Sequence, residues 1–173
     1  WRLSSGFLVG SGANFSSKDL SGLNLNGASL TKANFENANL SGVNLTKTNL
    51  TGVISGPIIG TPASLPSGWR LRSDFLIGPG ADLSFKNLSW IDFSGSDLSG
   101  VDLSYANLFH ANLKSTKLNK TNLTGVTSGS IDGSGVSLPK GWMLRSGYLI
   151  GPKANLSGAD LTGANLTGAN LTG

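Results

Sequence analysis

Residues 13–52 read ANFSS KDLSG LNLNG ASLTK ANFEN ANLSG VNLTK TNLTG, which is eight units of five residues in register. The same period returns as nine units in residues 81–125 and as four units in residues 154–173. All 21 third positions are Leu or Phe, 19 of the 21 second positions are Asn or Asp, and 11 first positions are Ala. This regularity indicates that every five residues form one structural module and that the modules stack.

A period of five fits neither the 3.6-residue helix nor the two-residue alternation of a plain strand. We interpret the first and third positions as the inward-facing residues of a short extended segment. The Asn, Asp and Gly residues near its end supply turn chemistry. A single turn of this kind cannot bury its apolar side, so stacked turns must share one continuous apolar column. The sequence therefore predicts an all-β solenoid.

A longer repeat lies over the five-residue period. Its start reads WRLSSGFLVG at residue 1, WRLRSDFLIG at residue 69 and WMLRSGYLIG at residue 142. We divide one continuous solenoid, residues 1–173, into super-repeats 1–68, 69–141 and 142–173, the last one truncated. The pentapeptide arrays are 13–52, 81–125 and 154–173, and the spacers between them are 53–80 and 126–153. The second array holds one pentapeptide more than the first, which predicts that Trp1 and Trp69 share a face and that Trp142 lies a quarter turn away. We assign these three Trp residues a structural role in the spacers.

Two interpretations of the 28-residue spacer are open. In the first, which we favour, it is a 20-residue coil plus an eight-residue bulge, because Leu71 and Leu76 keep the five-residue spacing. In the second, the segment that begins at Trp69 folds as a hairpin off the stack.

The repeat resembles the pentapeptide-repeat family, whose consensus is Ala-Asn/Asp-Leu-x-x, over 105 of the 173 residues. The Leu-Pro-x-Gly-Trp segments at residues 65–69 and 138–142 are similar to a spacer of long bacterial arrays in that family. The resemblance implies a right-handed quadrilateral β-helix in which four pentapeptides, about 20 residues, make one coil. It implies little about function, since members range from DNA mimics that bind gyrase to proteins of unknown role.

The composition argues against an enzyme. Cys is absent, His110 is the only histidine, and the abundant Ser and Asp residues occupy repeat positions, so we expect no catalytic site, no cofactor and no metal. The net charge of +4 comes from dispersed residues without a basic run, so we expect no nucleic-acid partner. No apolar run approaches the roughly 20 residues that cross a membrane, so we expect no membrane insertion.

Five residues of the second array form a candidate contact surface. Phe85, Trp90 and Tyr105 occupy fifth positions and should point outward, as should His110, while Phe109 occupies a fourth position. Phe85 and Tyr105 are 20 residues apart, as are Trp90 and His110, so each pair should stack on one face. A contiguous aromatic patch suggests a partner or self-association; local packing or covering by the chain's own spacer is the other interpretation.

Charged residues at repeat positions give two further expectations. Lys18 and Lys86 occupy inward first positions, and we expect their ammonium groups to turn out of the core, because an unpaired buried charge is expensive. Asp97 and Lys117, 20 residues apart, should stack as an oppositely charged pair on the surface.

Our first hypothesis is a structural protein, a subunit of an extracellular or cell-surface array that self-associates head to tail. The polar turns, the super-repeat and the lack of a recognisable end cap favour it, because open coil ends recruit further copies. A surface protein or a glycan is a further possible partner. The alternatives are a DNA mimic that binds topoisomerase, which the net charge of +4 and the single Glu disfavour, and an ice-binding or glycan-binding solenoid, for which no long Thr ladder is present.

Overall fold

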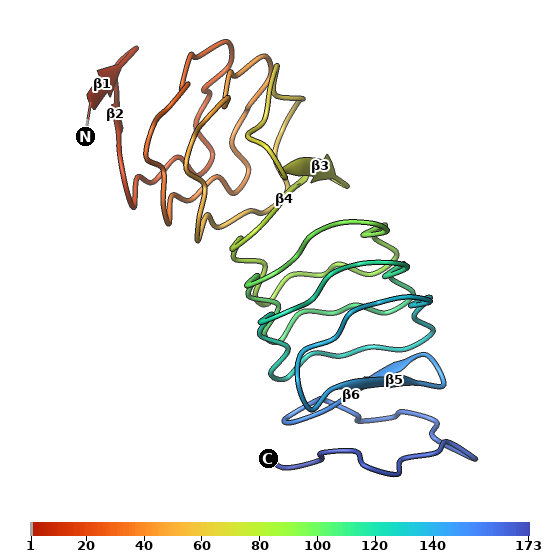
Figure 1. The fold of residues 1–173 in the computed structure, drawn as a ribbon. Coiled ribbons are helices and arrows are strands. Elements are labelled where there is room, and N and C mark those ends of the chain that lie inside the picture. The colour runs from red at the N-terminus through yellow and green to blue at the C-terminus, as the bar shows by residue number, and fades with distance from the viewer. Residues whose placement is uncertain (1) are drawn as a thin grey trace. The chain divides into compact units, whose positions relative to one another are not determined.

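The computed structural model describes residues 2–173, which are all-β. Six short strands pair into three antiparallel hairpins, β1 (Arg2–Ser4) with β2 (Phe7–Val9), β3 (Arg70–Arg72) with β4 (Phe75–Ile77), and β5 (Met143–Arg145) with β6 (Tyr148–Ile150). Between the hairpins the chain winds in stacked coils that isolated parallel bridges hold together (Figure 1). The described residues form no helix that is long and apolar enough to span a membrane.

The chain divides into two compact units, Trp1–Asp82 and Leu83–Gly173. The first unit holds the array 13–52, most of the first spacer and two of the hairpins. The second unit holds most of the second array, the second spacer, the third hairpin and the array 154–173. The same local structure builds both.

The first pentapeptide shows how the repeat folds. The backbone N–H of Lys18 donates to the carbonyl of Phe15 at 3.0 Å, which closes a turn through Ser16 and Ser17. The second-position Asn14 accepts the backbone N–H of Ser16 on its Oδ1 at 3.0 Å. Ser17, at the fifth position, has φ +56°, the left-handed region that the third residue of a type II turn requires. Asn or Asp therefore recurs at the second position because its side chain caps the turn.

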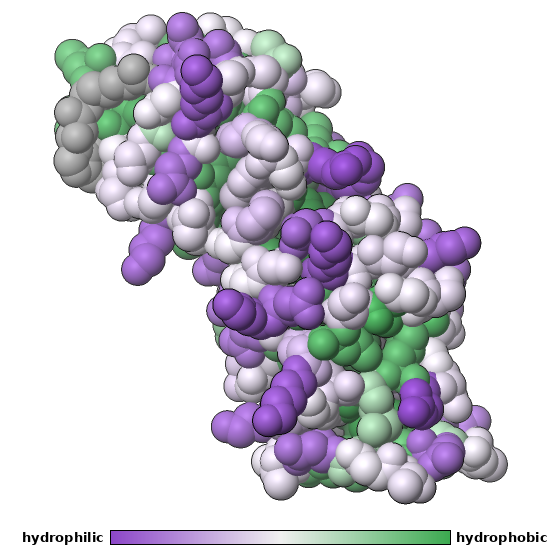
Figure 2. Space-filling view, in the orientation of Figure 1, coloured by the Kyte–Doolittle hydropathy of each residue, from purple (hydrophilic) through white to green (hydrophobic). Residues whose placement is uncertain are grey.

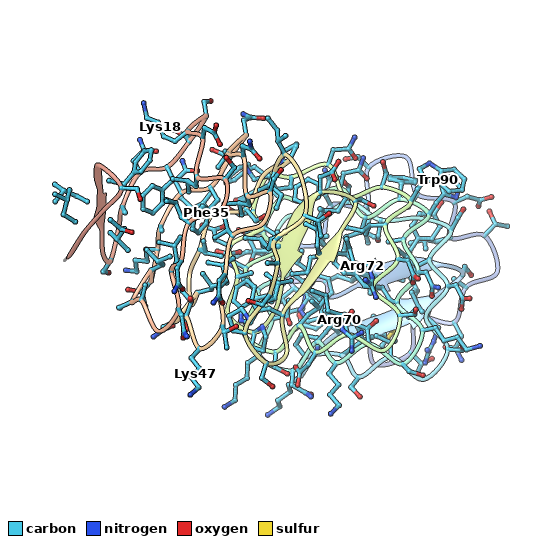
Figure 3. The ribbon with its side chains drawn as sticks, turned by 90° about the horizontal axis from the view of Figure 1, so that it is seen from above. Lys18, Phe35, Lys47, Arg70, Arg72 and Trp90 are labelled. Carbon is cyan, nitrogen blue, oxygen red and sulfur yellow. The ribbon has the colours of Figure 1, made fainter. Side chains whose placement is uncertain are left out.

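Successive coils bond through the second and third positions. Asn14 bridges Asn34 in parallel, and the N–H of Phe15 donates to the Asn34 carbonyl at 2.8 Å. Inside the coil the rings of Phe15 and Phe35 stack at 5.4 Å between centroids with 19° between their planes, and both are buried. Phe35 is drawn within the coil in Figure 3. The predicted inward direction of the third position is confirmed.

Polar residues at inward first positions are accommodated in two ways. Thr48 is buried, and its hydroxyl donates to the Leu25 carbonyl of an adjacent coil at 2.9 Å. Lys18 is exposed and extends away from the coil, so the expectation that it leaves the core is confirmed (Figure 3). Lys86 is half-buried and is not enclosed in the core either.

The spacers begin as coil. Ile54 and Ile59 bridge residues 20 positions earlier in the first array, and Thr127 does the same in the second. The next bridges then span 28 residues, Ile54 with Asp82 and Thr127 with Asn155. The spacer is thus one coil lengthened by eight residues, as its length predicted.

The form of the extra residues corrects the interpretation that we favoured. Leu71 and Leu76 are cross-strand partners in the hairpin β3–β4, not successive inward residues of one coil. The two turn residues, Ser73 and Asp74, have φ of +43° and +63°, which match the type I′ turn that joins right-twisted strands. The five-residue spacing of the two Leu residues is therefore the register of a hairpin. Its second strand returns to the coil, where Leu76 is fully buried.

Candidate contact surface

Four aromatic side chains of the second unit stand at the fifth position of the pentapeptide turn. Phe85, Trp90, Tyr105 and His110 have φ between +57° and +64°. The left-handed backbone directs their side chains away from the core. Trp90 is drawn at the outside of the coil in Figure 3, and hydrophobic side chains reach the visible surface of the second unit in Figure 2.

The rings form two stacks. The Phe85 and Tyr105 centroids lie 4.9 Å apart with 10° between planes, and those of Trp90 and His110 lie 3.9 Å apart with 13°. The predicted pairing of residues 20 apart is confirmed. The exposed fractions of Phe85, Trp90 and Tyr105 are 73%, 74% and 56%, so the stacks lie on the surface.

Local packing covers part of this surface. The ring of Tyr105 lies against Gly125, and the ring of Phe109 lies against Gly129; neither glycine has room for a Cβ. The Phe109 ring is also 6.3 Å from His110 and tilted by 55°. Phe109 is 39% exposed and so belongs to the edge of the surface. The second sequence interpretation, local packing, accounts for one face of two rings.

Stability alone gives no reason for these rings. A non-glycine residue in the left-handed region costs about 1–2 kcal/mol. A stacked aromatic pair returns about 0.5–1.5 kcal/mol, shared between two such residues. Gly95 and Gly100 occupy fifth positions of the same unit without that cost. Bulky exposed rings held in a strained conformation are typical of a site that meets another molecule.

The expected charge pair lies elsewhere on the second unit. Asp97 and Lys117 bridge in parallel on successive coils, as predicted. The side-chain and backbone hydrogen bonds from Ser99 hold the pKa of Asp97 below its usual value, and the nearby Lys117 charge lowers it further. This pair stabilises the charged carboxylate on a solvated face.

The described residues offer no site of metal chemistry. Within residues 2–173 no group of three His, Cys, Asp or Glu side chains is placed to hold an ion. His110, the only histidine of the chain, stacks on Trp90.

The spacer Trp residues pack inside their own hairpin segments. Trp69 and Trp142 are half-buried, and their indole rings lie against Gly78 and Gly151, where a Cβ would overlap the ring. Trp1 lies outside the described residues, and the predicted quarter-turn offset of Trp142 stays a prediction.

Two serines that the sequence reading passed over attach the hairpins to the coil. Ser55 and Ser128 occupy third positions where the arrays have Leu or Phe, and both are buried. Their hydroxyl oxygens accept the N–H of Leu76 at 2.7 Å and of Leu149 at 2.9 Å. The break in the Leu/Phe rule, in the same place in both spacers, was the signal that could have revealed them.

A family model described as pentapeptide repeats matches residues 19–54, 87–125 and 152–173 with eight copies, together more than half of the chain. The chain belongs to the pentapeptide-repeat family. It is therefore a β-helical repeat protein, and the family resemblance of the sequence is confirmed.

Solved structures of this family resemble the chain. A pentapeptide repeat protein from the thylakoid lumen of Arabidopsis thaliana is 25% identical, with a TM-score of 0.32, over 70% of this chain and 65% of that one. One from the cyanobacterium Cyanothece is 23% identical, with a TM-score of 0.37, over 75% and 86%. HetL of the cyanobacterium Nostoc, involved in the regulation of heterocyst differentiation, is 23% identical, with a TM-score of 0.31, over 90% and 70%. No curated protein sequence matches the chain. The chain spans less than two thirds of the length of the Arabidopsis protein.

Proposed function

We propose that this pentapeptide-repeat protein is a non-catalytic structural protein whose copies associate through the aromatic surface of the second unit, Phe85, Trp90, Tyr105, Phe109 and His110. We also propose that its coils have the right-handed quadrilateral form with about 20 residues per coil, to which the 20-residue spacing of the parallel bridges points. The observation that carries the proposal is the pair of exposed ring stacks on left-handed backbone.

The chemistry of the surface favours a second copy as the partner. Aromatic side chains with little charge around them are typical of the centres of protein contacts. The same patch on a second copy is equally aromatic, and a two-fold contact requires a self-complementary patch of this kind. A surface protein or a glycan is the competing partner.

The test replaces Trp90 and Tyr105 by Gly, the residue that already stands at other fifth positions. Sedimentation velocity over a concentration series should show weaker association of the double variant than of the wild-type chain. Ile59→Ser is the matched control, because Ile59 is 58% exposed but lies in the first unit. Unchanged association of the double variant would remove the aromatic surface from the proposal. Binding to a chitin or cellulose resin that the double variant loses would favour the glycan.

Head-to-tail stacking of coils forms a second part of the proposal. Leu8 is 64% exposed, whereas the equivalent Leu76 and Leu149 are fully buried beneath coils of their own units. The face of β2 that carries Leu8 therefore has the shape and polarity of a surface that a coil of a second copy can cover. The proposed extracellular or cell-surface location rests on the polar turns and the super-repeat alone.

A further inference from the structure

The outer strand of each hairpin has one residue whose backbone polar groups face away from the pair. In an antiparallel hairpin with a two-residue turn, the residues that flank the turn bond to each other and the next pair does not. Leu71 and Leu76 form that next pair, and the Leu76 N–H accordingly bonds outward to Ser55. Leu3, Leu71 and Leu144, the middle residues of β1, β3 and β5, thus turn an N–H and a carbonyl toward the open edge.

An arginine closes this edge in two of the three hairpins. Nη1 of Arg72 donates to the Leu71 carbonyl at 3.2 Å, and Nη1 of Arg145 donates to the Leu144 carbonyl at 2.9 Å. Figure 3 labels Arg72 beside β3. A charged side chain folded along an edge strand occupies its acceptor and disfavours the addition of another strand.

The first hairpin lacks that closure. Its register is the same, with Leu3 opposite Leu8 and Ser4 opposite Phe7, but Ser4 stands where the other hairpins have Arg. The Ser4 side chain is too short to fold back as the guanidinium does. No side chain within residues 2–173 donates to the Leu3 carbonyl, and the Leu3 side chain is 72% exposed.

We propose that the outer edge of β1 pairs with the β1 edge of a second copy, and that Arg72 and Arg145 keep β3 and β5 from pairing in the same way. In an antiparallel two-fold pair, Leu3 faces its own copy, so its N–H and carbonyl form two reciprocal hydrogen bonds. The two exposed Leu3 side chains are buried beside them. The proposal takes its partner from the proposed self-association but uses a surface separate from the aromatic one.

Ser4→Arg is the direct test, because it installs the closure that natural hairpins of this chain already tolerate. We expect it to weaken self-association by roughly tenfold, the order of effect that two lost hydrogen bonds have. Asn26→Arg, which adds the same charge at an exposed turn position of the first unit, should leave association unchanged. Equal association of Ser4→Arg and wild type, or a wild-type chain that stays monomeric at millimolar concentration, would overturn β1 pairing.

The reciprocal test opens a closed edge. Arg72→Ser should raise the weight-average mass at fixed concentration, while Arg70→Ser, on the same strand, removes the same charge and should not. If both variants behave alike, Arg72 has no closing role. The Trp90→Gly, Tyr105→Gly variant separates this proposal from the aromatic one: loss of its association alone refutes neither surface, whereas Ser4→Arg added to it should give monomers. A combined variant that still associates as the aromatic variant does would overturn β1 pairing.

Discussion

Replacing Trp90 by Gly distinguishes a surface ring from a supporting one. The side chain is 74% exposed, its backbone has φ +64°, and its ring contacts His110 at 3.9 Å. Removal of the ring forfeits about 0.5–1.5 kcal/mol of stacking. It also relieves about 1–2 kcal/mol of left-handed strain, since Gly adopts this conformation freely. The free energy of unfolding should therefore stay within about 1 kcal/mol of the wild-type value.

Leu88→Ala, in the same pentapeptide, provides the comparison. Leu88 is fully enclosed in the coil, and its truncation should cost about 2–5 kcal/mol. Amide hydrogen exchange of the second unit, followed with guanidinium unfolding, measures both variants on one scale. If Trp90→Gly destabilises the second unit by more than about 2 kcal/mol, the ring supports the fold, and its exposure gives no evidence of a contact surface.

Three further measurements follow from the same geometry. Ser128→Ala should cost about 1–3 kcal/mol and speed exchange of the Leu149 amide, because that buried N–H loses its acceptor; an unchanged exchange rate would contradict the bond. The pKa of Asp97 is lowered in the folded chain, so its small stabilisation is present above the pKa of the unfolded carboxyl and fades as the pH falls through the lower folded value. Ser99→Ala should raise that pKa in an NMR titration, and a stationary midpoint would refute the stated cause. Leu8→Ser should weaken end-to-end assembly in electron micrographs without lowering the unfolding midpoint, since Leu8 is largely exposed; filaments of unaltered length would count against coil stacking.

The pentapeptide turn could be predicted from sequence because all of its determinants lie within six residues. The second-position Asn or Asp caps the turn, the third-position Leu or Phe fills the coil, and the fifth position takes the left-handed backbone. The 20-residue pairing of Phe85 with Tyr105 and of Trp90 with His110 followed from the same period. Strict periodicity turns position in the chain into position in space, so the candidate surface needed no long-range information.

The spacer was misread because its five-residue spacing has two structural meanings. Leu71 and Leu76 are five apart whether they are successive inward residues or partners across a two-residue turn. Only the pairing of distant segments decides between them, through the bond from the Leu76 amide to Ser55 and the burial of Leu76.

The sequence by itself determined the family, the module and the outward direction of the aromatic residues, because these depend on local turn chemistry repeated at a fixed period. The tertiary structure decided that the spacers fold back as hairpins, that buried serines attach two of them to the coil, and that two of the three outer edges are closed by arginine. Those features depend on hydrogen bonds that a strand edge makes once it has been placed, and a backbone donor or acceptor leaves no mark in the sequence of its partner.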